Sequence, residues 1–410
     1  MLKKTNLKLV GAHVYMKKIC FITNFYPPVV SAASPQIARI ATFLRQSFDV
    51  QIITVDSPQK DDSLLLNLNY DNVKIIKKNK LNAFISNCRG NIIKKKLLPD
   101  LFYFNHYDLL TECKKTLNGY DNYIVTFGAP MSTHMVGFKL KKYFNLRWIA
   151  VFYDPWTDNC FNKYNFLTNM LNQKYERTTI ECSDAAIFSS KSYLKLMQTK
   201  YMHCDNKFKY IPLSCSVQNN TENININKNN KIIIRYLGSF YYDRQPYCLF
   251  KALTLIPIEY LQMIQIELIG NFMFNLTHDI KTLGLDEVVF TKNPVSYLES
   301  IKLMTEADVL LLIDAPDYNI FLPSKLVEYI NTGKPILAIT PDGESKDILT
   351  QSTTIHVIAD VNDIRDIADK LQKLIYTIHL NLIKIHENQP KNRFSIDVVG
   401  HQFKNCIDQL

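Results

Sequence analysis

The segment from 321 to 335, FLPSKLVEYINTGKP, holds the residue types and spacing best suited to chemistry. It follows a short apolar run and predicts a loop and then an amphipathic helix from Ser324 to Asn331. We expect the Ser324 hydroxyl to cap this helix, whose free N–H groups, together with Lys325, would attract an anion. Glu328, one turn later, can accept two hydrogen bonds from a vicinal diol such as a ribose. A diphosphate site beside a diol acceptor suits a nucleotide-sugar; the plain alternative is a surface lysine and glutamate.

Two series of alternating strands and helices must position this segment. In the first half, apolar runs predict strands at 18–23, 50–55, 123–127, 148–152, 185–189 and 209–213. In the second half, similar runs predict strands at 231–237, 265–270, 288–290, 309–313, 336–339 and 354–358. Strands that alternate with helices form parallel sheets that bind ligands at their carboxyl edges. The sequence therefore predicts an α/β fold with two Rossmann-like domains that face each other across a cleft.

A polar segment separates the two halves of the chain. Residues 216–230 contain almost no bulky apolar side chains, which is typical of a linker. We therefore expect an N-terminal domain over 1–215 and a C-terminal, nucleotide-sugar-binding domain over 231–394. The tail, 395–410, is expected to form a final helix.

Length and composition restrict the class of protein. At 410 residues, with 47% hydrophobic and 21% charged residues, the chain is typical of a two-domain soluble protein. No apolar run approaches the roughly 18–20 residues of a membrane span. Nine scattered cysteines without zinc-type spacing predict reduced thiols in the cytoplasm rather than a disulfide framework or a metal site. Lys17 and Lys18 interrupt any signal-peptide core, and translation is expected to start at Met1 or Met16.

The net charge of +10 is unevenly distributed. Between Val73 and Lys96 the sequence has eight basic residues, no acidic ones and several interleaved apolar residues. Such a mixture suits an anionic bilayer surface, here the inner face of a membrane. A nucleic acid is the rival partner, but no recognised binding motif accompanies the charge, so we expect none. A solvated basic surface is the plain alternative.

The 321–335 segment resembles the donor-binding signature of the retaining glycosyltransferases of GT-B architecture, in particular glycosyltransferase family four. That family has two glutamates eight positions apart around the loop–helix junction. Glu328 matches the second, which implies that it binds the ribose of the donor, whereas Ile320 stands at the first position. The resemblance covers most of residues 17–400. It also implies that the final helix, within 395–410, crosses back to the first domain.

The loop after the first strand of the second half adds Gly238, Ser239 and Arg244. A glycine at a strand end lets the backbone approach a ligand, and Arg244 can form paired hydrogen bonds to a diphosphate. The family usually has an arginine directly after the glycine and a lysine five positions later. Ser239 takes the arginine position and Arg244 the lysine position, so the resemblance implies that Lys325 supplies the second charge. The plain alternative is a surface loop with a solvated Arg244.

Two loops of the first half also resemble this family. Tyr153, Asp154 and Trp156 end a predicted strand, in a segment similar to the Asp-Phe-Arg-Asp-Pro-Trp of one subgroup. Tyr153 stands where many members have the histidine of a His–Asp pair. The loop from Gly128 to His134 resembles a Pro-Pro-His-Ser-Ser-His loop of the same subgroup. By resemblance, Asp154, Tyr153 and His134 act on the reacting sugar; alternatively, Asp154 caps a turn before a proline and His134 is structural.

The resemblance implies a reaction as well as a fold. A sugar would pass from a nucleotide-diphosphate sugar to a saccharide or polyprenyl-linked acceptor, with retention of configuration, in the synthesis of a surface polysaccharide. The lack of an Asp-x-Asp motif favours a reaction without metal or further cofactor, in which Arg244, Lys325 and the Ser324 amide offset the leaving-group charge. Two alternatives stay open. One is an epimerase of the same architecture, which needs acid and base carboxylates at the sugar; the other is a non-catalytic sugar-nucleotide-binding relative.

Overall fold

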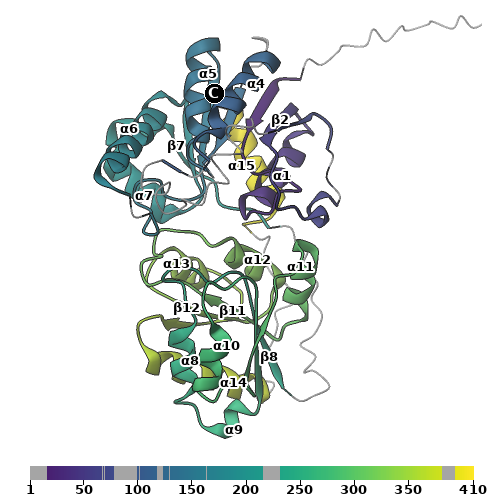
Figure 1. Cartoon of the computed structure of the whole chain (residues 1–410), viewed down its shortest axis with the longest axis vertical. Coiled ribbons are helices and arrows are strands. Elements are labelled where there is room, and N and C mark those ends of the chain that lie inside the picture. Colours follow the sequence, from purple (N-terminus) through teal and green to yellow (C-terminus); the bar gives the residue numbers. More distant parts are fainter. Residues whose placement is uncertain are drawn as a thin grey trace, which may run out of the picture.

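The structure, a computed structural model, describes residues 16–66, 68, 70–77, 99–100, 102–117, 123–128, 130–162, 164–215, 231–380 and 393–410. Within these residues the chain forms two α/β domains, one above the other along the longest axis of the molecule (Figure 1). The segment predicted to be a linker, 216–230, lies outside the described residues, as does most of the basic stretch. Val73–Ile76, at the start of that stretch, form strand β3. Within the described ranges, no helix is long and apolar enough to cross a membrane.

A parallel sheet forms the centre of the first domain. Over the described part of this domain it has seven strands in the order β3-β2-β1-β4-β5-β6-β7. Besides β3, these are β1 (Lys18–Ile22), β2 (Asp49–Val55), β4 (Tyr123–Phe127), β5 (Arg147–Phe152), β6 (Ala185–Phe188) and β7 (Phe208–Tyr210). The helices are α1 (Ala33–Leu44), η1 (Asp62–Leu65), α4 (Asn105–Thr116), α5 (Thr133–Phe144), α6 (Phe166–Cys182), α7 (Lys191–Lys200) and η2 (Met202–Lys207). The strand order changes direction between β1 and β4, where such sheets open a crevice at their carboxyl ends.

The second domain repeats this plan with a smaller sheet. Its described strands follow the order β10-β9-β8-β11-β12-β13 and pair in parallel. They are β8 (Ile232–Leu237), β9 (Ile264–Ile269), β10 (Val289–Lys292), β11 (Val309–Ile313), β12 (Ile336–Thr340) and β13 (His356–Asp360). The helices of this half are α8 (Tyr247–Leu253), α9 (Ile258–Leu261), α10 (Leu276–Thr282), α11 (Tyr297–Glu306), α12 (Ser324–Thr332), α13 (Glu344–Thr350) and α14 (Ile364–His379). Here the crevice lies between β8 and β11.

Burial on both faces explains the apolar runs of the strands. Every residue of β4 and of β11 is buried. Alternate residues of β1 serve different cores, because successive strand side chains point to opposite faces. Ile19 and Phe21 pack with α1, whereas Cys20 and Ile22 pack with residues of α4, α5 and α7. Helices on both faces of a parallel sheet produce these continuous apolar strands.

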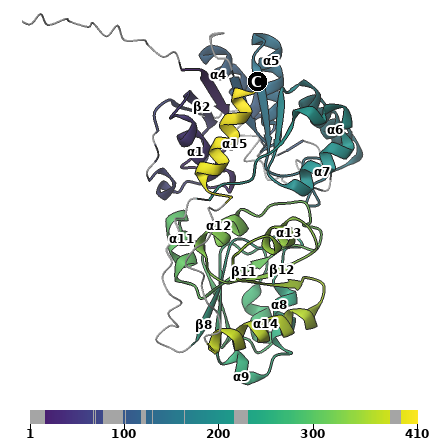
Figure 2. The same ribbon diagram turned by 180° about the vertical axis from the view of Figure 1, so that it is seen from behind.

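The chain crosses between the domains at two adjacent segments. The Cys215 N–H donates to the Phe394 carbonyl over 2.8 Å. The backbones of Cys215 and Ser395 also form an isolated parallel β-bridge. From there helix α15 (Ile396–Asp408) lies against α1 of the first domain, as Figures 1 and 2 show in yellow. Gly400 permits this approach, because a Cβ at its position would lie 2.4 Å from the Phe43 ring. The final helix thus makes the crossing that the resemblance implies.

Candidate functional site

A cavity of about 210 Å³ lies between the two domains. The first domain lines it with residues that follow β1, β5 and β7: Ser31, Ala32, Ala33, Gln36, Tyr153, Asp154 and Leu213. The second domain lines it with the ends of β8 and β11 and the loops after them: Tyr236, Tyr241, Arg244, Leu312, Ile313, Asp314, Tyr318, Leu322, Pro323, Ser324 and Lys325. Both sheets therefore present their carboxyl edges to the cavity, which is where ligands bind in such folds.

Arg244 brings an incompletely satisfied charge to the cavity wall. Its Nη1 donates to the Tyr241 hydroxyl over 3.3 Å, and its guanidinium lies 4.4 Å from the centre of the Tyr318 ring. Among the described residues, Nε and Nη2 are buried without a hydrogen-bond partner. Burial disfavours the charge, but the tyrosines and Asp314 outweigh that effect and raise the pKa of Arg244. A buried cation with unused donors in a cavity is suited to an anion.

Asp314 is a second charged residue of this wall, and sequence reasoning missed it. It follows β11 directly, and its Oδ1 lies 3.9 Å from Nη2 of Arg244. The Thr340 hydroxyl donates to its Oδ2 over 3.0 Å. Burial raises the pKa of the Asp314 carboxyl, and Arg244 partly opposes this shift. Its position at the carboxyl edge of a strand is a signal in the sequence that could have identified it.

The start of helix α12 faces the cavity as expected, but its cap differs from the prediction. The helix begins at Ser324, and Pro323 in extended conformation takes the cap position without a side-chain hydrogen bond. The prediction that the Ser324 hydroxyl caps the helix is therefore wrong, because Ser324 is already the first helical residue. Ser324 and Lys325 both line the cavity. Burial lowers the pKa of the Lys325 ammonium, and Glu328 partly opposes this shift.

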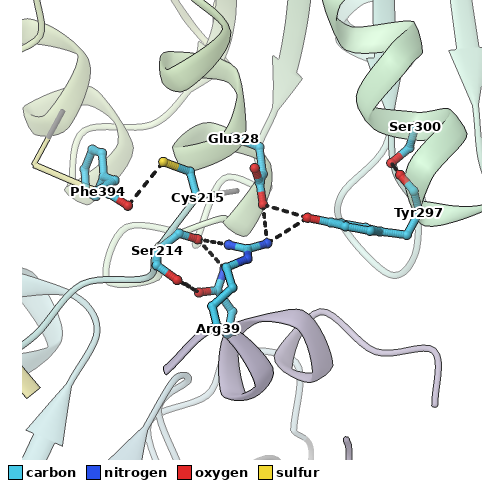
Figure 3. Close-up of polar contacts among 8 residues, drawn as sticks. Arg39, Ser214, Cys215, Tyr297, Ser300, Glu328 and Phe394 are labelled. Atoms are coloured by element: carbon cyan, nitrogen blue, oxygen red, sulfur yellow. Dashed lines mark hydrogen bonds and ion pairs between the residues drawn. The ribbon is translucent and has the colours of Figure 1, made fainter. Parts of the chain in front are cut away.

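Glu328 is not part of the cavity wall. It is only 4% exposed, and its Oε1 lies 2.7 Å from Nη2 of Arg39, on helix α1 of the other domain (Figure 3). Burial disfavours the charge on Arg39, but Glu328 and Tyr297 outweigh it and raise the pKa of the guanidinium. The carboxylate assigned to the ribose is thus engaged by an arginine that sequence reasoning did not single out.

Asp154 and Tyr153 both reach the cavity from the first domain. The Asp154 side chain is open to the cavity, opposite the arginine-bearing wall. Desolvation by the surrounding protein raises the pKa of the Asp154 carboxyl, and Arg244 partly opposes the shift. Burial also raises the pKa of the Tyr153 hydroxyl. Asp154 therefore lies where it can contact a ligand held by Arg244.

His134 lies in the interior of the first domain, and the cavity lining does not include it. Its side chain is fully buried, 4.5 Å from the Phe152 ring, and Nδ1 pairs with the Thr126 hydroxyl over 2.8 Å. Burial lowers its pKa to about 3. His134 thus lies in the first turn of α5, which the sequence placed in a loop, and it packs in the core instead of facing the cavity, so its predicted role on the sugar stays a prediction.

Gly238 and Ser239 also lie outside the cavity lining. The Gly238 N–H donates to the Ile269 carbonyl over 2.9 Å, and the Tyr236 hydroxyl donates to the Ser239 carbonyl over 3.2 Å. Gly270 packs on the same turn, where a Cβ would lie 1.7 Å from the Gly238 oxygen. In this conformation the two residues lie in the loop that presents Arg244 and do not line the cavity, so their predicted contact with a diphosphate stays a prediction.

Aromatic and polar contacts join the domains around the cavity. Phe161, in the loop after β5, packs against four second-domain rings: Tyr241, Tyr242, Tyr318 and Phe321. Glu344, at the start of α13, accepts hydrogen bonds from the backbone N–H groups of Lys191 and Ser192, at 3.0 and 2.8 Å. It therefore caps α7 of the other domain. No motif in the sequence identified these contacts, since each pairs residues far apart along the chain.

Across the described ranges, no group of three His, Cys, Asp or Glu side chains is placed to hold a metal ion.

Comparison with known proteins gives a structural relationship without a sequence relationship. No protein-family model matches the sequence, and no curated protein matches it. Sucrose-phosphate synthase from Thermosynechococcus elongatus matches with a TM-score of 0.68 at 13% identity, over 96% of this chain and 98% of that one. Anabaena Alr3699/HepE in complex with UDP and glucose matches with a TM-score of 0.63 at 14% identity, over 96% and 100%. The lipopolysaccharide outer core galactosyltransferase WaaB matches with a TM-score of 0.61 at 14% identity, over 96% and 99%.

These matches extend over both domains of each protein. The chain therefore has the GT-B fold of glycosyltransferases, two Rossmann-like domains with the cavity between them. This confirms the fold class that the sequence predicted.

Proposed function

We propose that this protein is a glycosyltransferase that moves a sugar from a nucleotide-diphosphate sugar to a saccharide or lipid-linked saccharide. The observation that supports this most directly is Arg244, a buried guanidinium in the wall of the interdomain cavity, two of whose nitrogens have no hydrogen-bond partner among the described residues. Lys325 and the first N–H groups of α12 border the same cavity. Two cations and a helix N-terminus together match the charge of a diphosphate. The complexes of Alr3699/HepE with UDP and glucose, and with UDP-glucose, support the same class of ligand.

The residues would divide the work as follows. Arg244, Lys325 and the Ser324 amide hold the diphosphate and offset its charge as the glycosidic bond breaks. Asp154, with Tyr153 beside it, orients a hydroxyl of the reacting sugar from the opposite wall. Because these groups supply the positive charge themselves, we propose a reaction independent of metal. By resemblance, configuration is retained and the leaving diphosphate helps to deprotonate the acceptor on the same face of the sugar.

A ligand screen tests this proposal. The purified protein is heated with nucleoside diphosphates and nucleotide-sugars, with and without EDTA. We expect a rise in melting temperature with one of them, unaffected by EDTA and lost in Lys325→Ala. If a folded protein responds to none of them, the donor site proposed here does not exist.

An epimerase of the same architecture is the second candidate. Asp154 and Asp314 both line the cavity, and the pKa of each carboxyl is raised by burial, which suits acid and base roles. Incubation with a nucleotide-sugar and no acceptor separates the two reactions. An epimeric nucleotide-sugar among the products would favour the epimerase, and its absence together with transfer to an added saccharide would favour the transferase.

We further propose that the acceptor lies at an anionic membrane and belongs to a surface polysaccharide. Helix α6 of the first domain begins with Phe166 and Leu167, which are 77% and 74% exposed, and Met170 is 53% exposed. Lys174 and Arg177 continue this face along the helix. Pro99, three residues after the basic stretch in the sequence, lies near the start of this helix, since the Tyr164 hydroxyl donates to the Pro99 carbonyl over 3.1 Å. An apolar tip with basic flanks suits the inner face of a cytoplasmic membrane, and the lipopolysaccharide enzyme WaaB has the same fold.

Sedimentation with vesicles tests the membrane contact. We expect binding to vesicles that contain phosphatidylglycerol but not to pure phosphatidylcholine vesicles. The double variant Phe166→Asp, Leu167→Asp should lose it, whereas Met273→Asp, on an equally exposed residue of the second domain, should keep it. If the wild type sediments with neither kind of vesicle, this contact is excluded.

A further inference from the structure

An ion pair between Arg39 and Glu328 connects the two domains beside the cavity (Figure 3). Arg39 lies on α1 of the first domain, and Glu328 lies on α12 of the second. Their side chains are 11% and 6% exposed. Nη2 of Arg39 also donates to the Tyr297 hydroxyl over 2.8 Å, and Nη1 donates to the Ser214 carbonyl. Both terminal nitrogens of the guanidinium, Nη1 and Nη2, therefore have partners.

The pair lies directly behind the cavity wall. Gln36, one turn before Arg39 on α1, lines the cavity, and so does Lys325, nearly one turn before Glu328 on α12. The Gln36 side chain also donates to the Ser214 carbonyl over 2.9 Å, the same carbonyl that accepts from Arg39. Helices α1 and α12 thus both lead from the cavity to the ion pair. A nucleotide whose diphosphate contacts Lys325 would bring its ribose toward Glu328.

The contacts of Glu328 set up a competition. Its Oε1 faces Arg39 at 2.7 Å and the Tyr297 hydroxyl at 3.4 Å, and the residue is only 4% exposed. A charged guanidinium is a stronger hydrogen-bond donor than a ribose hydroxyl. Because the carboxylate is also buried, a ribose can reach this oxygen only by displacing a neighbour that already contacts it. Breaking the pair also leaves two buried charges to be satisfied in another way. A ligand that engages Glu328 must therefore rearrange a contact between the domains.

We propose that Arg39 competes with the donor ribose for Glu328, so that nucleotide binding requires the exchange of this cross-domain ion pair. This inference rests on the proposed function, because it needs a nucleotide in the cavity. Arg39 then reduces the affinity for nucleotides but not for a diphosphate that lacks a ribose. The exchange would couple occupation of the ribose site to movement of α1 against α12.

Titration calorimetry with two probes tests the competition. UDP contains a ribose and a diphosphate, whereas inorganic pyrophosphate contains only the diphosphate part, so the ratio of their affinities isolates the ribose contribution. We expect Arg39→Met to raise this ratio in favour of UDP by about tenfold. This is the effect expected if Arg39 occupies Glu328 about nine-tenths of the time, so that only about one-tenth of the protein can bind the ribose. Loss of one positive charge weakens both probes alike and leaves the ratio unaffected.

Three variants control the interpretation. Tyr297→Phe removes one hydroxyl from the group, should fold, and should move the ratio in the same direction by about twofold. Glu344→Gln weakens a cross-domain contact that does not touch Glu328, so it should leave the ratio unchanged. Glu328→Gln tests the ribose assignment: an unchanged ratio would mean that the ribose binds elsewhere.

The outcomes separate the inference from the proposed function. An unchanged ratio in Arg39→Met, with normal probe binding to the wild type, would overturn the competition alone. A lower ratio would also overturn it, because Arg39 would then hold Glu328 in position for the ribose. Failure of the wild type to bind either probe would overturn the inference and count against the proposed function.

Discussion

At the residue scale, the cavity concentrates ionisable groups that the protein itself satisfies poorly. Among the described residues, Arg244 has two buried nitrogens without a hydrogen-bond partner. The pKa of Lys325 is lowered by burial, while burial raises the pKa values of Asp154 and Asp314. Groups in such environments cost stability. They cluster at functional sites because binding and catalysis need groups with shifted pKa values.

Arg244→Met should separate binding from stability. We expect the affinity for pyrophosphate to fall about 10- to 100-fold, the effect of losing hydrogen bonds from a charged group. The melting temperature should change little, because removal of a buried charge with unused donors offsets the loss of its ion pair with Asp314. Thermal denaturation and calorimetric titration measure the two effects. Arg147→Met, at an arginine 58% exposed outside the cavity lining, is the control and should change neither. A large loss of stability in Arg244→Met would show that the arginine is structural.

His134 should make the protein sensitive to acid. Its pKa is lowered from the usual value near 6.5 to about 3, because burial disfavours the charged ring. Below pH 6.5 the unfolded state therefore binds a proton that the folded state does not, and stability falls as the pH decreases. The loss is at most about 1.4 kcal/mol per pH unit between pH 6.5 and 3.

Unfolding with urea at pH 7 and pH 5 measures this dependence. In His134→Asn the number of protons taken up on unfolding at acidic pH should fall by about one, so the free energy of unfolding should depend less on pH. His106, whose pKa is lowered to about 4 by burial, should retain its own share. An unchanged slope in His134→Asn would mean that the ring is protonated in the folded protein.

At the element scale, two helices determine the architecture of the site. Helix α12 begins at Ser324 without a side-chain cap from the described residues, so its first N–H groups can serve an anion. Helix α15 fixes the second crossing of the chain by packing on α1. Because α1 also contributes Gln36 to the cavity and Arg39 to the ion pair, α15 supports the site from behind.

The contact between α15 and α1 can be tested at Gly400. A Cβ at this position would lie 2.4 Å from the Phe43 ring. Gly400→Ala should therefore destabilise the protein by about 1–3 kcal/mol, although alanine favours helices over glycine. The double variant with Phe43→Ala should recover part of this loss, because the obstructing ring is gone. Chemical denaturation of the four proteins in this cycle gives the coupling, and a stabilising Gly400→Ala would show that the helices pack less closely.

At the scale of the whole molecule, polar contacts hold the domains together on several sides of the cavity. Arg39 pairs with Glu328, the Tyr297 N–H donates to Asp61 over 2.6 Å, and Glu344 caps α7. The Ser190 hydroxyl also donates to the Ile320 carbonyl over 2.7 Å. Ile320 stands where the resembling family has its first glutamate, so the chain has no carboxylate at this position. These contacts depend on how the domains face each other, so a change in that arrangement would alter all of them.

Glu344→Ala should loosen the domains. The variant removes the acceptor of the first two N–H groups of α7, which costs about 1–2 kcal/mol, and with it a contact between the domains. We expect the radius of gyration from small-angle X-ray scattering to increase. Asp363→Ala is the matched control, because Asp363 caps α14 within the second domain through the N–H groups of Arg365 and Asp366. It should lose similar stability without a change in radius. An equal radius for both variants would exclude a role for Glu344 in holding the domains.

The sequence by itself determined the local elements and the edge of each sheet that lines the cavity. Apolar runs located the strands, because parallel strands are buried on both faces. The polar run at 216–230 that predicted the break between the halves lies outside the described residues. Arg244, Lys325 and Asp154 could be placed near a ligand because they follow strands at the carboxyl edge. Even here the cap at Ser324 was misplaced by one residue, because the pattern of types does not fix the dihedral angles of Pro323.

Only the tertiary structure decided which of these residues share the cavity and which partners occupy them. His134 lies near the expected strand end, but the packing of α5 turns it into the core. Glu328 has the expected position on α12, yet Arg39, 289 residues away in sequence, holds its carboxylate. Such pairings depend on how two separately folded sheets face each other. That arrangement is set by many weak contacts between distant residues, and no local pattern of residue types encodes it.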